Sequence, residues 1–363
     1  MVKGKSEKMK KIAIITHWHP FTGGGKYAFN IFDRLSKGKK FKTNLIYHEY
    51  DSNRVGYMDG VIKIRSNSFN FLNKTIYTYY DFTKHIPDGY DIYHATNQFL
   101  AKTAHYRKPC VISHLDLIPI LFSKGKFAPI GFFLKRLLKY YKEAEHIIAI
   151  SELVRDELLQ FMNIPDEKIS VIYPGFDEKI YKPINKETAR KKLGLPLDKK
   201  IILNVGSEEP DKGVPFLLEI LKWKKYMKFF KDVVLIRIGS SNPKWDAVKK
   251  SIGIIQLKGI PEEQMPLYYS AADVFAAPFN YGAGFVYPPL EAIACGIPAL
   301  VSNLQFDGYM NVPQNLFADM LENILEDEKF RKGLVSKSLE SSKSYTLTKE
   351  IQEINKIYKR VLE

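Results

Sequence analysis

Short runs of β-branched and aliphatic residues alternate with longer amphipathic segments along most of the chain. The run at 11–16, KIAIIT, is followed at 24–36 by a segment with helical spacing of its apolar residues, and this order then repeats. Strands that alternate with helices pair in parallel, because each helix carries the chain back to the start of the next strand. The sequence therefore predicts an α/β architecture in which helices cover parallel sheets.

Two such series are predicted. In the first, strands are expected at 11–16, 44–48, 61–64, 91–94, 109–113, 146–150 and 168–172. In the second, strands are expected at 200–205, 233–238, 254–257, 274–277 and 299–301. A length of 363 residues is also typical of two domains. We predict doubly wound, Rossmann-like domains at 1–177 and 178–346, followed by a periodic helix at 347–363 that packs back on the first domain.

The chain is basic, with 55 lysine and arginine residues against 40 acidic ones and a formal net charge of +15. These residues are scattered rather than gathered in one tract, which favours a solvated surface and argues against nucleic-acid binding. A segment at 127–142 mixes aromatic and basic residues; it either packs on its own domain or rests on an anionic membrane.

No apolar run reaches about 18 residues, and no signal peptide is recognised. The two cysteines, Cys110 and Cys295, lie in apolar surroundings and are expected to be reduced. We therefore expect a cytoplasmic protein, with peripheral association at the inner membrane face as the alternative that the 127–142 segment leaves open.

The segment 283–298, AGFVYPPLEAIACGIP, joins a loop containing glycine and proline to a short apolar helix. Glu291 is expected in the first turn of that helix, where a carboxylate either partners the helix dipole or faces ligand hydroxyl groups. Backbone N–H groups of the loop and of the helix N-terminus are suited to an anion. A carboxylate that faces hydroxyl groups and N–H groups that face a diphosphate together favour a sugar nucleotide as the ligand.

This segment resembles the donor-binding signature of the retaining glycosyltransferases of family 4, which have the GT-B fold of two Rossmann-like domains facing across a cleft. The family's usual form is Glu-Gly-Phe-Gly-Leu-Pro-x-x-Glu-Ala. Glu291 matches its second glutamate, whereas Ala283 stands in place of the first. The resemblance implies that Glu291 binds the donor ribose. It also implies backbone contacts to the donor phosphates or sugar from Gly284, Phe285, Val286 and Tyr287.

Residues 204–213, NVGSEEPDKG, resemble the phosphate clamp of the same family, Gly-Arg-x-x-x-x-Lys-Gly. Lys212 falls on the lysine and Ser207 on the arginine, so one cationic phosphate ligand is replaced. A lysine in a closing cleft stabilises charge on a leaving diphosphate; the alternative for Lys212 is a solvated loop residue. Ile260, after the strand at 254–257, is implied to pack on the nucleotide base, which leaves UDP and GDP donors open.

A glycine turn follows the first strand of the first domain and opens a helix. It is either a flexible turn or a turn whose amides approach phosphate oxygens. The resemblance places this turn near the donor phosphates and the acceptor. The residues so implied are Gly23, Gly24 and Gly25, with Lys26 as a further cation.

The strand at 109–113 runs into His114, and Asp116 follows two residues later. These residues look like the family's strand-end His-Asp pair, here separated by Leu115. The resemblance implies that a neutral His114 donates a hydrogen bond to the donor sugar. The alternatives are a structural histidine and, for Asp116, a cap of the following turn.

Taken together, the resemblance implies transfer of a sugar from a nucleoside diphosphate sugar to an acceptor hydroxyl, with retention at the anomeric carbon and without a metal ion. The predicted catalytic residues are Lys212, Glu291 and His114. No cofactor is expected, and the acceptor is a glycan, a lipid or a protein. Two alternatives remain open. One is a nucleotide-sugar- or glycan-binding protein with weakened catalysis, which Ala283 and Ser207 favour; the other is a sugar-nucleotide epimerase.

Overall fold

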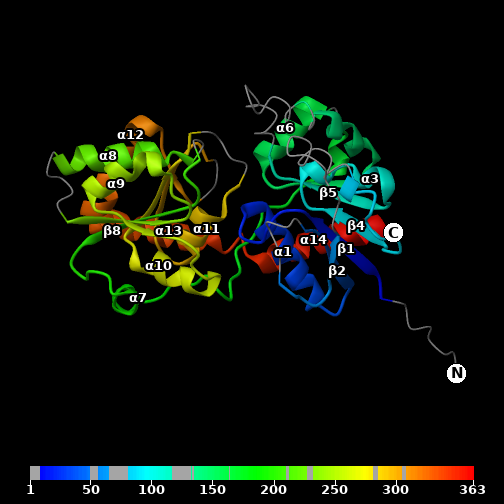
Figure 1. The fold of residues 1–363 in the computed structure, drawn as a ribbon, viewed down its shortest axis with the longest axis horizontal. Helices are drawn as coiled ribbons and strands as arrows, with labels where there is room; N and C mark the ends of the chain where they lie inside the picture. The colour runs from blue at the N-terminus through cyan, green and yellow to red at the C-terminus, as the bar shows by residue number, and fades with distance from the viewer. Residues whose placement is uncertain are drawn as a thin grey trace. The chain divides into compact units, whose positions relative to one another are not determined.

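The computed structural model describes residues 9–49, 56–64, 81–116, 132, 135–162, 164–209, 212–226, 232–280, 285–304 and 308–363. The chain divides into two compact units (Figure 1). One unit consists of Met1–Pro174 with Lys349–Glu363, and the other of Gly175–Thr348. Each unit is built on its own parallel sheet, and the predicted α/β class with two Rossmann-like sheets is confirmed.

The first unit contains a seven-stranded parallel sheet in the order β3-β2-β1-β4-β5-β6-β7. Its strands are β1 (Lys11–Thr16), β2 (Lys42–His48), β3 (Val61–Ile64), β4 (Ile92–Ala95), β5 (Cys110–His114), β6 (His146–Ala149) and β7 (Ile169–Val171). Its described helices include α1 (Gly23–Ser36), α3 (Thr103–Tyr106), α6 (Glu152–Met162) and α14 (Leu347–Leu362), which enters this unit at Lys349. The strand order reverses between β1 and β4, as in doubly wound folds.

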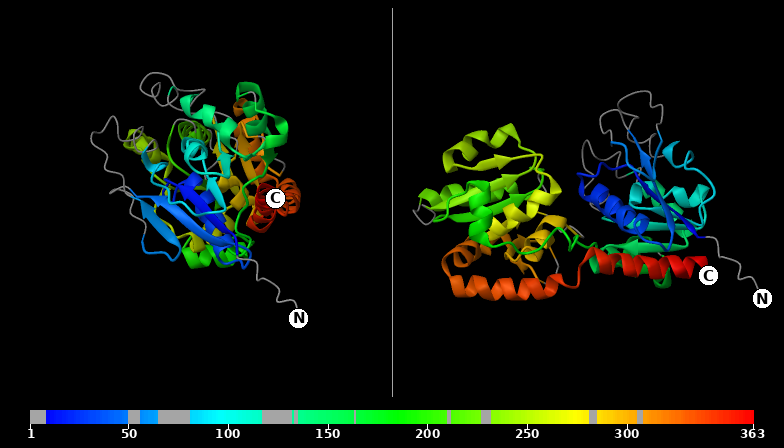
Figure 2. Two further views of the ribbon diagram at one scale, coloured as in Figure 1. Left: turned by 90° about the vertical axis from the view of Figure 1, so that its right-hand side faces the viewer. Right: turned by 90° about the horizontal axis from the view of Figure 1, so that it is seen from below.

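A chain of buried polar side chains fastens α14 to this sheet. The hydroxyl of Tyr358 shares a 2.7 Å hydrogen bond with Nδ1 of His94 on β4. The other ring nitrogen of His94 lies 2.7 Å from the hydroxyl of Ser113 on β5, which in turn lies 2.8 Å from the hydroxyl of Tyr27 on α1. Figure 2 shows α14, in red, along the strands of this unit. All four side chains are buried, so α14 is an integral part of the first unit.

The second unit contains a six-stranded parallel sheet in the order β10-β9-β8-β11-β12-β13. Its strands are β8 (Lys200–Val205), β9 (Val233–Ile238), β10 (Ile255–Leu257), β11 (Val274–Pro278), β12 (Ala299–Ser302) and β13 (Met310–Asn311). Its described helices are α7 (Lys186–Leu193), α8 (Val214–Tyr226), α9 (Asp246–Ile252), α10 (Met265–Ala271), α11 (Tyr287–Ala294), α12 (Gln314–Glu326) and α13 (Glu328–Ser342). The strand order reverses between β8 and β11.

Two hydrophobic cores cover the two faces of this sheet because successive strand residues point to opposite sides. Ile201 and Leu203 of β8 belong to the core shared with α10 and α11. Ile202, between them, belongs to the core shared with α8 and α12. Helices on both faces leave the carboxyl ends of the strands as the open edge, which is where ligands bind in open α/β sheets.

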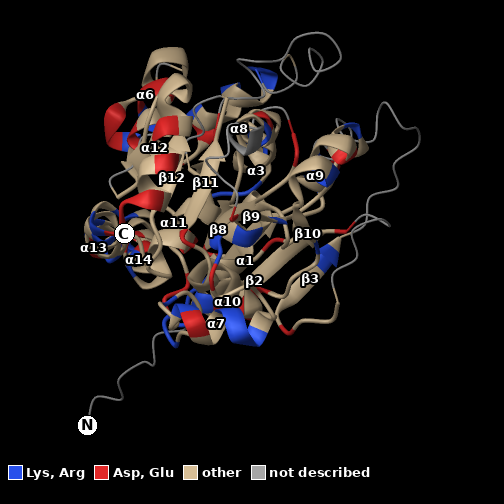
Figure 3. Cartoon of the chain, turned by 90° about the vertical axis from the view of Figure 1, so that its left-hand side faces the viewer, with Lys and Arg blue, Asp and Glu red and all other residues tan. Residues whose placement is uncertain are grey.

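The predicted strands are all present, with ends that differ by no more than two residues. The short β13 is not predicted, because a strand of two residues is too short to show a pattern of apolar residues. Lysine and arginine lie close to acidic residues on surface helices such as α7, where Glu187 precedes Arg190 and Lys191 (Figure 3). Among the described residues, no helix is both long and apolar enough to span a bilayer.

The predicted amphipathic segment at 127–142 lies partly outside the described residues, at 127–131, 133 and 134. Its described end forms a 3-10 helix, Leu138–Glu143, in which Tyr140 and Tyr141 are buried. The Phe132 side chain is exposed. Membrane association therefore stays a prediction.

Candidate functional site

The carboxyl edge of the second sheet brings two sequence-predicted segments into contact. β8 and β11 are neighbours at the point where the strand order reverses, and the loops that follow them emerge side by side. Gly213, in the loop after β8, has φ of +65°, and a Cβ there would lie 1.6 Å from the carbonyl oxygen of Pro278 at the end of β11. Glycine is therefore required where these loops meet.

Lys212 lies at this meeting point. Its backbone N–H donates to the carbonyl of Glu209 at 3.0 Å, and its Nζ lies 6.0 Å from the ring centroid of Phe279, just beyond β11. The lysine thus sits over the segment that leads towards α11. Ser207 has a different environment, because its hydroxyl donates to the carboxylate of Glu209 at 2.9 Å. The position at which the resemblance places a cation therefore carries a hydroxyl beside a carboxylate.

Between β11 and α11, residues 281–284 lie outside the described residues, and these include Ala283 and the predicted donor ligand Gly284. Phe285 and Val286 are partly buried and pack against the core under α10 and α11. The ring of Phe285 meets that of Tyr287 edge-on, with centroids 5.4 Å apart. Val286 precedes the helix, and Tyr287 is the one residue among the first three of α11 with a backbone N–H, because Pro288 and Pro289 have none.

Glu291 lies in the second turn of α11, so the predicted first-turn placement is wrong. The helix begins at Tyr287 and takes prolines into its first turn, which leaves no acidic residue there. Proline fits this position because the first N–H groups of a helix have no partner within it. Glu291 therefore does not partner the helix dipole, whose effect is confined to the first turn.

The carboxylate of Glu291 is buried, with 4% of the residue exposed, and accepts a hydrogen bond from the Tyr269 hydroxyl at 2.7 Å. Burial and then the charge of Glu291 raise the pKa values of Tyr269, Tyr181 and Tyr309, so these phenols stay protonated. The carboxylate thus lies among phenol rings within the second unit. Its assignment to ribose stays a prediction.

Ile260 follows β10 after Gly259, which has φ of +68°. Its side chain is partly buried and packs against the core shared with α10 and α11. The turn that carries it lies at the same carboxyl edge as the loops after β8 and β11. A contact between Ile260 and a nucleotide base stays a prediction.

In the first unit, β5 places His114 at the carboxyl edge of its sheet. The ring is fully buried, and Nδ1 shares a 2.5 Å hydrogen bond with the Tyr141 hydroxyl. Nε2 is buried and has no hydrogen-bond partner among the described residues. Burial lowers the pKa of His114 to about 3, so the imidazole is neutral near pH 7. Asp116 follows, and its backbone carbonyl accepts from the Gln98 amide at 3.1 Å.

The glycine turn opens α1, and Thr22 caps it by accepting from the Gly25 N–H at 3.1 Å. A Cβ on Gly24 would lie 1.8 Å from the Trp18 ring, and one on Gly25 would lie 1.9 Å from the His19 carbonyl oxygen. A Cβ on Gly23 would meet no atom of the described residues within 4 Å. Packing therefore explains two of the three glycines and leaves Gly23 unexplained. Lys26, in the same first turn of the helix, is partly buried.

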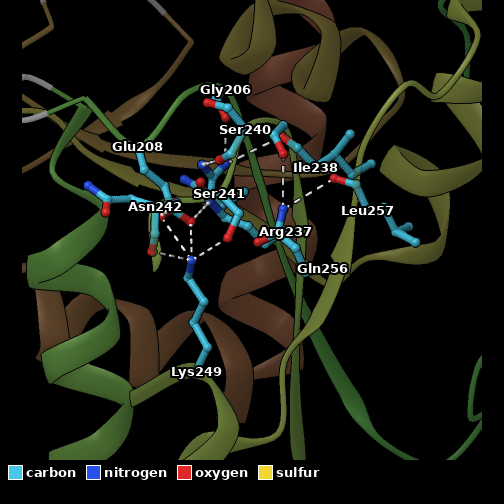
Figure 4. Close-up of polar contacts among 12 residues, drawn as sticks. Gly206, Glu208, Arg237, Ile238, Ser240, Ser241, Asn242, Lys249, Gln256 and Leu257 are labelled. Carbon is cyan, nitrogen blue, oxygen red and sulfur yellow. Dashed lines mark hydrogen bonds and ion pairs between the residues drawn. The ribbon is translucent and has the colours of Figure 1, made fainter. Parts of the chain in front are cut away.

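Sequence reasoning missed a buried charge cluster at the carboxyl edge of the second sheet, formed by Glu208, Arg237 and Lys249 (Figure 4). Arg237 lies on β9 and Lys249 on α9, and both contact Glu208, which lies in the loop after β8. One signal was present: an arginine interrupts the apolar run VVLIRI, where a fully buried strand is expected to be apolar throughout.

The described residues hold no group of three or more His, Cys, Asp and Glu side chains arranged to bind a metal ion. Metal independence stays a prediction.

Comparison with known proteins identifies the family. The model for Glycosyl transferases group 1 matches residues 185–338, and that for Glycosyltransferase Family 4 matches residues 21–179. The chain belongs to the group 1 glycosyltransferases. Sequence relatives include D-inositol 3-phosphate glycosyltransferases from Mycolicibacterium smegmatis, 29% identical over 44% of this chain, and from Corynebacterium diphtheriae, 25% identical over 56%. The matches span 38% and 53% of those two proteins.

Solved structures place this glycosyltransferase in the GT-B fold. Sucrose-phosphate synthase from Thermosynechococcus elongatus superposes with a TM-score of 0.82 at 18% identity, covering 97% of this chain and 99% of that one. Anabaena HepE in complex with UDP-glucose superposes with a TM-score of 0.74 at 17% identity, covering 96% and 99%. At these identities the likeness concerns the fold, and the predicted GT-B fold is confirmed.

Proposed function

We propose that this glycosyltransferase moves a sugar from a nucleoside diphosphate sugar, with UDP or GDP as the nucleotide, to an acceptor hydroxyl with retention at the anomeric carbon. The observation that carries the proposal is the meeting of the loops after β8 and β11 at the reversal of strand order, with Lys212 over Phe279. Family membership and the UDP-glucose complex of Anabaena HepE support the choice of donor.

The roles follow from charge and position. In the second unit, Lys212 and the N–H groups around Val286 stabilise the leaving diphosphate, since fixed positive groups aimed at developing charge lower the barrier. Glu291 binds the ribose hydroxyls in competition with the Tyr269 hydroxyl that it holds in this structure. In the first unit, His114 Nε2, which has no hydrogen-bond partner among the described residues, donates to a hydroxyl of the donor sugar.

No protein nucleophile is assigned. The acceptor hydroxyl attacks the anomeric carbon on the face that the leaving group vacates, and a phosphate oxygen of the leaving nucleotide takes the acceptor proton. The bond from the anomeric carbon to the phosphate oxygen breaks as the new glycosidic bond forms. The protein contributes orientation and charge stabilisation, and no step requires a metal ion.

Donor binding and turnover test the proposal. Titration with UDP- and GDP-sugars, followed by transfer to a panel of glycans, lipids and polyols including inositol phosphates, should reveal one preferred donor. Lys212→Ala should lower kcat/KM by roughly a hundredfold or more, the effect of losing one group that stabilises transition-state charge. The matched control is Lys332→Ala, because Lys332 is an exposed lysine of the same unit that pairs with Glu328 on α13. Equal activity of the two variants would contradict the role of Lys212.

A protein that binds the donor without turning it over is the second candidate, because Ser207 faces the Glu209 carboxylate where the resemblance places an arginine. Donor binding without transfer or hydrolysis across the whole panel would favour this candidate over the first.

A further inference from the structure

We propose that Glu208 is a positioning residue for the loop that follows β8. Its carboxylate, held by Arg237 and Lys249, fixes the backbone of that loop at the carboxyl edge of the second sheet. The loop carries Ser207 and Lys212, so the inference rests on the proposed function, which assigns this loop to the donor diphosphate.

The carboxylate is held from three directions. Lys249 Nζ lies 2.8 Å from Oε1 and 2.9 Å from Oε2, and the backbone N–H of Asn242 donates to Oε2 at 2.5 Å. Arg237 Nε lies 3.6 Å from Oε1. The exposed fractions of the Glu208, Lys249 and Arg237 side chains are 2%, 9% and 0%. Burying three charges is costly unless they are paired, so removing one partner leaves a buried charge uncompensated.

The same cations hold two loops together (Figure 4). Arg237 donates to the carbonyl of Gly206 at 2.8 Å and to that of Ser240 at 3.1 Å, which joins the loop after β8 to the loop after β9. Lys249 adds hydrogen bonds to the Ser241 hydroxyl at 2.7 Å and to a backbone carbonyl. A Cβ on Gly239 would lie 1.9 Å from the Gly206 carbonyl oxygen, so the two backbones are in direct contact.

A second buried carboxylate in this unit provides a control that distinguishes an effect on loop position from an effect on stability. Asp273, just before β11, accepts from Arg190 at 2.8 Å, from Lys186 at 2.7 Å and from the Ile201 N–H at 2.8 Å. It is also a buried carboxylate with two cations, but it lies at the amino ends of β8 and β11. Asp273→Asn therefore reproduces the loss of a buried charge network at the edge that does not bear the proposed site.

The direction in which Kd changes in Glu208→Gln distinguishes a positioning role for Glu208 from a direct electrostatic effect on the ligand. Glu208→Gln removes a negative charge near the proposed diphosphate site, and Coulomb attraction alone would then tighten the binding of an anion. A loop that has lost its anchor presents Lys212 less accurately and binds the anion more weakly. The two mechanisms therefore predict opposite changes in Kd for the same variant.

Calorimetric titration of the full chain with UDP, GDP and their glucose and mannose derivatives tests the inference. We expect Glu208→Gln to raise Kd roughly ten- to a hundredfold, the size of effect that follows when a ligand-binding group is displaced by about 1 Å. Hydrogen exchange at 206–209 without ligand should quicken in Glu208→Gln. Asp273→Asn should lower the thermal midpoint, yet leave Kd and exchange at 206–209 close to wild type.

The outcomes are distinct. If the wild type binds none of these ligands, the proposed function fails, and this inference fails with it. If the wild type binds one of them and Glu208→Gln binds it equally well or more tightly, the proposed function stands and the positioning role is overturned. If Glu208→Gln does not fold, Ser241→Ala is the alternative variant, because it removes only one hydrogen bond of Lys249. It should change hydrogen exchange at 206–209 and Kd in the same direction, by a smaller factor. No change in either quantity would overturn the positioning role.

Discussion

Gly23 offers a substitution whose effects on stability and on activity should separate. A Cβ at this first residue of α1 meets no atom of the part of the chain that the structure describes within 4 Å, and the backbone does not have the positive φ that favours glycine. Gly23→Ala should therefore stabilise the fold by about 0.4–1 kcal/mol, mainly because alanine has less freedom in the unfolded chain. For a unit of roughly 150–250 residues, this corresponds to a rise of about 1–4 °C in the thermal midpoint.

Gly25→Ala is the matched control in the same turn. Its Cβ would lie 1.9 Å from the His19 carbonyl oxygen, which only a backbone shift can relieve. We expect a loss of about 1–3 kcal/mol, the usual cost of overpacking. Thermal unfolding of both variants under one condition compares them directly. A drop in the midpoint for Gly23→Ala as large as that for Gly25→Ala would refute the geometric reasoning.

The activity of Gly23→Ala then decides between the two interpretations of the turn. If a phosphate approaches the Gly23 backbone, a methyl group there obstructs it, and donor affinity should fall by tenfold or more, or about 1.4 kcal/mol. A merely flexible turn would leave affinity unchanged in a fold that is slightly more stable. Titration with the preferred donor provides the measurement.

Three further predictions concern buried groups. Tyr269→Phe removes the 2.7 Å hydrogen bond that the buried Glu291 carboxylate accepts and should lower the free energy of unfolding by about 1–3 kcal/mol, measured by thermal or denaturant unfolding. Burial lowers the pKa values of His94 and His114 from 6.5 to about 3, so the unfolded chain binds more protons between these values and stability should fall as pH drops from 6.5 towards 3. His114→Gln should make that fall shallower by up to about 1.4 kcal/mol per pH unit, and an unchanged slope would contradict the assignment. Gly213→Ala places an alanine in the left-handed backbone conformation, with its Cβ overlapping a backbone carbonyl. This variant should lose at least about 1–2 kcal/mol in free energy of unfolding and bind the donor more weakly. Wild-type values for both stability and affinity would contradict the contact between the two loops.

The fold was largely predictable because its strands are apolar on both faces. The runs KIAIIT at β1 and KIILNV at β8 stand out against polar surroundings, and buried parallel strands require this pattern. The boundaries of α11 were less readable. Its prolines indicate a loop in isolation, yet they fit the first helical turn, and this is why Glu291 was assigned to the wrong turn.

The candidate site was predictable only as a set of segments. The sequence motifs located Lys212 and His114 at strand ends, but the partners of those residues come from distant parts of the chain. Tyr141, which holds His114, lies 27 residues away, and Lys249 lies 41 residues from Glu208. Side-chain pairs of this kind leave no periodic signal in one sequence, since they depend on how loops at one sheet edge meet in space.

The polar chain through His94 has a practical meaning for anyone who divides this protein. A fragment that stops after Pro174 lacks Tyr358, so Nδ1 of the buried His94 loses its hydrogen-bond partner. The apolar surface that the last helix covers in the full chain is then exposed to water. The amino-terminal half should therefore be insoluble when expressed alone. Supplying residues 349–363 as a separate peptide, or fusing them through a linker, should restore it.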